Sequence, residues 1–106
     1  MLVLFDQSTP LPLRAFLKCH IVRTAAQQGW ARLKNGGLLI VAEEAGFEVL
    51  LTPDKNMRYQ QNLAGRKIAI VVVGNPQWPI LRPHVERVVA AVNSATPGSY
   101  TKVGIP

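Results

Sequence analysis

Two aspartates stand at corresponding places in this chain, each shortly after an apolar run. Asp6 directly follows residues 2–5, and Asp54 directly follows residues 49–53. Short apolar runs of this kind are typical of buried strands in a parallel sheet, and ligands gather outside the carboxyl ends of such strands. The chain contains only six acidic residues. Two of them at one sheet edge therefore predict a site for a hard divalent cation and, with it, phosphate chemistry.

Two asparagines are expected at the same edge. Asn35 stands at the start of an expected helix over residues 36–45, and a helix that follows the second strand begins at the carboxyl edge of the sheet. Asn56 lies two residues beyond Asp54 and can point back into the site from its loop. The predicted site therefore combines two carboxylates with two amide oxygens: Asp6, Asn35, Asp54 and Asn56.

The predicted metal ligands are the two aspartates. Magnesium binds one or two carboxylates and completes its octahedron with waters and substrate phosphate. Such an ion polarises a phosphodiester and lowers the pKa of a bound water. Three basic residues are candidates for holding the phosphate backbone or stabilising developing charge: Arg14, Lys55 and Arg58. Glu43 is expected about 12 Å further along the helix axis than Asn35 and is interpreted as a surface carboxylate.

A purely structural interpretation of the same residues is also open. An aspartate after a strand is a common loop cap, and asparagine is a common turn residue. Asn35 is a good N-cap for its helix, and Asn56 is a good cap for a helix that begins at Met57. Either aspartate alone favours a structural role, whereas both together at one sheet edge favour a functional site.

Apolar periodicity predicts strands that alternate with helices. Strands are expected over residues 2–5, 20–24, 47–52 and 68–73, with helices over residues 10–17, 36–45, 57–63 and 82–93. This alternation predicts an α/β fold: a three-layer sandwich with a central, mainly parallel sheet of four to five strands in the order 2-1-3-4. That order brings the first and third strands side by side, so Asp6 and Asp54 are expected to meet.

The last part of the chain leaves two choices. Residues 1–94 are expected to form one domain, and residues 95–106 a tail that either adds an edge strand over residues 100–105 or acts as a partner-binding arm. The last helix carries an apolar stripe at helical spacing: Val85, Val88, Val89 and Val92. This stripe is expected to pack on the sheet rather than on a second copy in a homodimer.

Composition narrows the class of protein and partner. The chain has 12 Lys and Arg against 6 Asp and Glu, and the resulting net charge of +6 favours a polyanion or an acidic protein partner. No apolar run is long enough for a membrane span, and no secretory signal is expected at the start. Cys19 is the single cysteine, which rules out an internal disulfide and fits the reducing cytoplasm.

The chain resembles the small PIN-like proteins that are often encoded as toxin–antitoxin modules. The likeness rests on Leu4-Phe5-Asp6, on Asn35 seven residues before Ala42, and on residues 46–56, which end in Thr-Pro-Asp-Lys-Asn. It covers about the first three quarters of the chain. The resemblance implies a Mg²⁺- or Mn²⁺-dependent ribonuclease whose acidic residues cluster at the carboxyl edge of the sheet. It also implies RNA as the substrate and a protein antitoxin as the partner.

Departures from the family pattern leave other functions open. Family members commonly carry aspartate at the positions of Asn35 and Asn56, so weaker metal binding is expected here. One alternative is a PIN-like protein that binds RNA or a protein partner without cleaving. Another is a phosphoacceptor domain of the receiver type, in which Lys102 would imitate a late lysine. Receivers normally carry an acidic pair after the first strand, whereas Asp6 is followed by Gln7.

Overall fold

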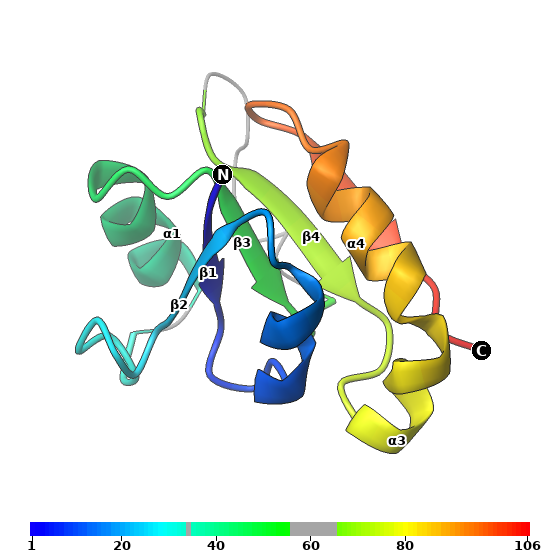
Figure 1. The fold of residues 1–106 in the computed structure, drawn as a ribbon. Coiled ribbons are helices and arrows are strands. Elements are labelled where there is room, and N and C mark those ends of the chain that lie inside the picture. Colours follow the sequence, from blue (N-terminus) through cyan, green and yellow to red (C-terminus); the bar gives the residue numbers. More distant parts are fainter. Residues whose placement is uncertain (34, 56–65) are drawn as a thin grey trace.

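The described residues form one parallel sheet of five strands (Figure 1). The computed structural model describes residues 1–33, 35–55 and 66–106. The strands are β1 (Leu2–Phe5), β2 (Ile21–Thr24), β3 (Val49–Thr52), β4 (Ala69–Val73) and β5 (Tyr100–Val103). Their order is β2-β1-β3-β4-β5, and every neighbouring pair is parallel. The predicted α/β class and the order 2-1-3-4 are confirmed, and the segment after residue 94 contributes the fifth strand.

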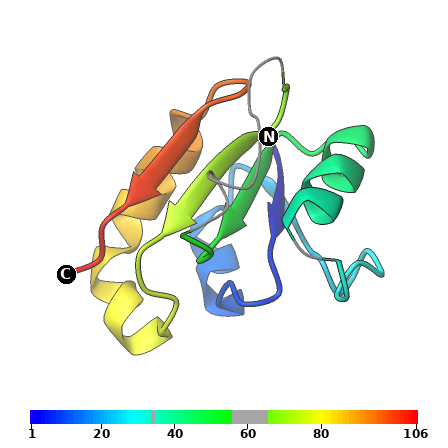
Figure 2. The same ribbon diagram turned by 180° about the vertical axis from the view of Figure 1, so that it is seen from behind.

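Helices cover both faces of this sheet and complete a three-layer sandwich (Figures 1 and 2). One face carries α1 (Asn35–Glu44). The other face carries the 3₁₀ helix η1 (Leu11–Phe16), α3 (Trp78–Leu81), the 3₁₀ helix η2 (Arg82–His84) and α4 (Val85–Asn93). The predicted helix over residues 57–63 lies outside the described residues. Within the described ranges, no helix has the length and apolar character needed to cross a membrane.

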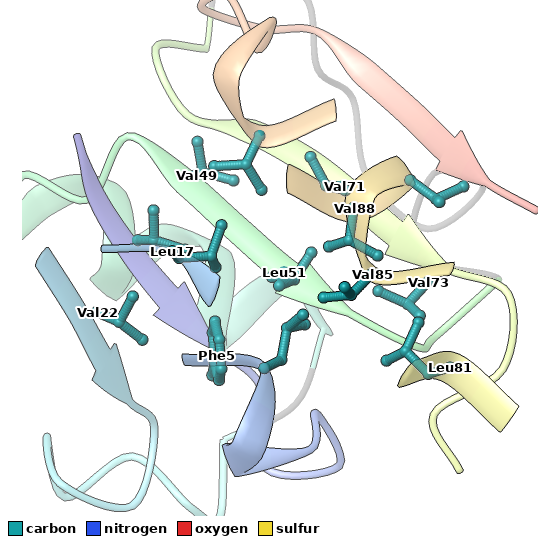
Figure 3. Packing of buried hydrophobic residues seen from close by; sticks show 14 of the residues in the cluster. Phe5, Leu17, Val22, Val49, Leu51, Val71, Val73, Leu81, Val85 and Val88 are labelled. Carbon is teal, nitrogen blue, oxygen red and sulfur yellow. The ribbon is translucent and has the colours of Figure 1, made fainter. Parts of the chain in front are cut away.

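Successive side chains of the strands point to opposite faces and build two apolar cores. On the α4 side, Phe5 and Leu51 pack in one cluster with Val88 (Figure 3). On the α1 side, Leu50 packs in a second cluster with Leu39. Every residue of β3 and β4 is buried. Strands covered on both faces carry mainly apolar residues, which is why β4, and β3 apart from Thr52, appear in the sequence as continuous apolar runs.

The apolar stripe of α4 packs on the sheet, as predicted. Val85, Val88 and Val92 are buried, and Val89 is partly buried against the same cluster. Figure 3 shows Val85 and Val88 directed towards the β3 and β4 side chains. Burial of these valines against the sheet supplies the main apolar contact that holds α4 in place.

Prolines divide the last helical segment into shorter pieces. The prediction of one helix over residues 82–93 is wrong in detail, because helical structure already begins with α3 at Trp78 and η2 separates α3 from α4. Pro79 and Pro83 each stand in the first turn of their helix. Proline fits a first turn, where its missing N–H has no partner to lose, but it interrupts a continuous α-helix.

Candidate functional site

The strand register directs Asp6 and Thr52 to the same side of the sheet. Phe5 pairs with Leu51, and the N–H of Asp6 donates to the carbonyl of Leu51 at 3.0 Å. Leu50 points to the α1 side. Because side chains alternate along a strand, Thr52 points to that side as well, and Asp6 lies beside it at the end of β1. Both polar side chains therefore lie at the carboxyl edge of the sheet, on the face that α1 covers.

A buried hydroxyl links the two aspartates. Thr52 is fully buried. Its Oγ1 donates to Oδ2 of Asp6 at 2.6 Å and accepts from the backbone N–H of Asp54 at 3.1 Å. The other oxygen of Asp6, Oδ1, accepts from the backbone N–H of Gln7 at 2.5 Å. Both carboxylate oxygens of Asp6 are thus held in fixed positions, and the loop that carries Asp54 is tied to the same threonine.

Asp6 and Asp54 line one cavity of about 300 Å³ at this edge. Both carboxylates are half-buried. The rest of the lining comes from two places: the loops that carry the aspartates supply Gln7, Ser8 and Pro53, and the segment that leads into α1 and the first turn of α1 supply Ala31, Leu33 and Leu38. The two aspartates do not lie directly opposite each other in the sheet, because Thr52 occupies the position beside Asp6 and Asp54 comes two residues later. Both residues line the same cavity instead.

The predicted amide ligands are placed only in part. Asn35 is the first residue of α1, so the backbone at this position lies near the end of the sheet where Leu38 lines the cavity. Asn56 and Arg58 lie outside the described residues. The prediction that α1 begins at the carboxyl edge agrees with the contribution of Leu33 and Leu38 to the cavity wall.

The two other predicted basic residues do not line the cavity. Lys55 is exposed and directly follows Asp54, so it stands at the rim of the site. Arg14 belongs to η1, whose residue Leu13 packs into the core on the α4 side. Arg14 is therefore on the face of the sheet opposite the carboxylates, and of the two only Lys55 is near the site.

Glu43 lies at the opposite edge of the sheet. Its Oε2 accepts from the backbone N–H groups of Lys67 and Ile68 at 2.7 and 3.3 Å, and its Oε1 pairs with Arg66 at 3.2 Å. The hydrogen bond from Lys67, aided by that from Ile68 and by Arg66, lowers the pKa of the Glu43 carboxyl below its ordinary value. Glu43 therefore fastens the end of α1 to the start of β4 and takes no part in the cavity.

The donor set of the cavity suits a hard cation. Carboxylate oxygens are the ligands that Mg²⁺ and Mn²⁺ prefer. None of the described residues that line the cavity is basic. Within the described part of the chain, no three His, Cys, Asp or Glu side chains come together as a metal site. Asp6 and Asp54 could thus hold an ion that keeps several waters.

Sequence reasoning missed the role of Thr52. The available signal is its place in the Thr-Pro-Asp segment, one residue past the last strand position paired between β1 and β3. From the local sequence alone, a threonine at the end of a buried strand indicates only a residue that favours strand structure. Its contact with Asp6 depends on the register between two strands that are 46 residues apart.

A scan against protein-family models finds no match, and searches of curated proteins and of solved structures find no significant similarity either.

Proposed function

We propose that the protein is a Mg²⁺- or Mn²⁺-dependent ribonuclease of the PIN-like type, acting in the cytoplasm as the toxin of a toxin–antitoxin module. The observation that carries this proposal is the shared cavity of Asp6 and Asp54 at the carboxyl edge of the sheet. The net charge of +6 supports it, because a basic protein attracts the phosphate backbone of RNA.

The two carboxylates would hold the cation. When bound, such an ion polarises a phosphodiester and lowers the pKa of a water for attack. Each oxygen of Asp6 accepts one hydrogen bond from the protein, from Thr52 and from Gln7. A carboxylate oxygen has two lone-pair directions, so one direction on each oxygen is still available for a ligand. The protein thereby orients Asp6 without using up its capacity to bind.

Charge also guides the choice of partners. Lys55 is exposed at the rim beside Asp54 and is suited to contact a phosphate of the RNA backbone. An antitoxin that neutralises the protein would be acidic, since it must compete with RNA for a basic surface.

Cleavage of labelled RNA in the presence of Mn²⁺ tests this function. Asp6→Ala and Asp54→Asn should each lower the rate at least about tenfold, the loss seen even for residues that only support a metal ligand. Glu44→Gln removes an exposed carboxylate at the far end of α1 and serves as the matched control with an unchanged rate. Cleavage that survives Asp6→Ala would reveal a contaminating nuclease and remove the support for this function.

A second function is favoured by the amide residues at two of the four predicted positions. With Asn35 and Asn56 in place of aspartates, the site holds two fewer negative charges. A PIN-like protein that binds RNA or a protein partner without cleaving it fits this reduced charge. RNA binding measured by fluorescence polarisation, together with no Mn²⁺-dependent cleavage by wild-type protein, would select this function over the first.

A further inference from the structure

A second cavity lies on the opposite face of the sheet from the two aspartates. It has a volume of about 430 Å³ and runs between α4 and the segment that joins η1 to β2. Figure 1 shows η1 and α4 on the same face, and the two helices contact each other. We call this cavity the η1–α4 groove. Its size falls within the range of small-molecule binding sites.

The floor and walls of the groove are apolar. Leu17 is buried beneath it, and Val89 is partly buried on the α4 side. Phe16 forms one wall and is 42% exposed, so a large part of its ring faces solvent. The Phe16 ring contacts the Trp78 ring, with the two ring centroids 5.8 Å apart and the rings tilted by 46°. An exposed aromatic ring held by a second ring offers a fixed apolar surface to a ligand.

Polar groups close one end of the groove and already satisfy each other. His20 Nε2 lies 2.6 Å from Oδ1 of Asn93, which joins the start of β2 to the end of α4. His20 Nδ1 lies 3.1 Å from the amino group of Met1. Both ring nitrogens of His20 are therefore engaged within the protein. This end of the groove forms a boundary and not an anchoring point for a ligand.

Among the described residues that line the groove, Lys18 is the one lysine or arginine, and none is a carboxylate. Among the described residues, the ion pair of Arg66 with Glu43 is the one salt bridge, so the ammonium group of Lys18 is not neutralised by a described side chain. Glu86 of α4 is exposed but does not line the groove. An apolar groove beside an unneutralised ammonium complements a ligand with an apolar body and an anionic end.

We propose that the η1–α4 groove binds a small amphipathic anion. The apolar body of the ligand packs on Phe16, Leu17 and Val89, and its carboxylate or similar anionic head lies beside Lys18. This site is separate from the proposed nuclease cavity, because the two cavities are on opposite faces of the sheet. The proposal does not depend on ribonuclease activity.

Cys19 provides a local reporter for occupancy. It is the only cysteine of the chain, it is exposed, and it lines the groove. A ligand in the groove should slow the reaction of its thiol with 5,5′-dithiobis(2-nitrobenzoate). Three probes of equal chain length but different head-group charge separate the effect of ligand shape on binding from that of ligand charge: octanoate, octan-1-ol and octylammonium. Octanoate should give half-protection at a concentration at least about threefold below that of octylammonium, the scale of one exposed ion pair.

Variants with matched controls test whether Lys18 causes the preference for the anionic probe and whether that probe binds in the groove. Lys18→Gln should abolish the preference for octanoate, whereas Lys102→Gln, which removes an exposed lysine from β5, should leave it unchanged. Ala15→Trp should fill the groove and remove the heat of octanoate binding in calorimetry. Ala26→Trp introduces the same side chain at an exposed position that does not line the groove and should retain that heat.

Three results would overturn the proposal. Octanoate at its soluble concentrations could fail to protect Cys19. Octan-1-ol or octylammonium could protect it as well as octanoate does. The octanoate preference could also persist in Lys18→Gln, which would mean that this lysine does not recognise the anionic head.

Discussion

The hydroxyl of Thr52 donates a 2.6 Å hydrogen bond to the carboxylate of Asp6, although the two residues are 46 positions apart in the chain. The same oxygen accepts from the backbone N–H of Asp54. One buried side chain thus controls the orientation of one predicted metal ligand and the path of the loop that carries the other. This arrangement makes Thr52 the support of the candidate site.

Replacing Thr52 by valine should separate this role from packing. Valine keeps the shape but lacks the hydroxyl, so we expect a loss of about 1–3 kcal/mol in the free energy of unfolding, because hydrogen bonds to a carboxylate and a backbone N–H are removed. Mn²⁺ affinity, measured by calorimetry, should fall in Thr52→Val. Thr52→Ser keeps the hydroxyl and should retain the affinity. Equal loss of Mn²⁺ binding in both variants would contradict an orienting role.

Restoring carboxylates at the two asparagines should strengthen metal binding. Asn35→Asp combined with Asn56→Asp adds two negative charges, and cation affinity rises with the charge of the ligand set. We expect the Mn²⁺ dissociation constant to fall at least about tenfold. Gln27→Glu combined with Gln77→Glu adds the same charge at exposed positions outside the cavity and is the control. A calorimetric titration without change in the first variant would count against this site.

Glu43 should make folding stability depend on acid pH. Its pKa is lowered in the folded protein, mainly by the hydrogen bond from the N–H of Lys67. The carboxylate therefore stabilises the fold above its ordinary pKa of 4.5, and this contribution is lost as the pH falls through the lower folded value. Chemical unfolding at pH 7 should show Glu43→Gln roughly 1–2 kcal/mol less stable than wild type.

The difference between Glu43→Gln and wild type should shrink steadily as the pH is lowered from 4.5. Glu44→Gln alters the neighbouring, exposed carboxylate and should follow the wild-type curve throughout. A deficit in Glu43→Gln that stays constant down to acid pH would show that charge has no part in the contact.

Truncation of the α4 stripe should destabilise the monomer itself. Val88 is fully buried against the sheet, so Val88→Ala should lower the free energy of unfolding by roughly 2–3 kcal/mol through lost apolar burial and a small cavity. Ile80→Ala, at a side chain that is 38% exposed, should cost less. The unfolding midpoint should not depend on protein concentration, as it would if this helix packed on a second subunit.

The sheet was largely predictable because its signals are local. β4 is apolar at every position and β3 at every position except Thr52, and strands alternating with helices restrict the connections to parallel crossovers. The end of α1 could also be predicted from the sequence, because a glycine commonly ends a helix. Gly46 does so here with a positive φ of 91° just after the helix. These features placed Asp6 and Asp54 at one edge.

The remainder depends on contacts between distant segments. Thr52 looks like an ordinary strand residue until the register sets it beside Asp6. The groove could not be anticipated either, because it is a space between η1 and α4 that exists only once both helices pack on the sheet. The start of α3 at Trp78 lies outside the predicted helix over residues 82–93 for a local reason: proline is common in loops but is equally well suited to a first turn, as Pro79 is here.

In the part of the chain that the structure describes, the sheet ends at β2 and β5, whose outer backbone edges have no partner strand. Each of these edge strands carries an exposed basic residue, Arg23 on β2 and Lys102 on β5. Two copies whose sheets approached edge to edge would bring these like charges together. Charged side chains on open edge strands commonly oppose aggregation of this kind. Like charges on the two edge strands should therefore also disfavour growth into a continuous intermolecular sheet.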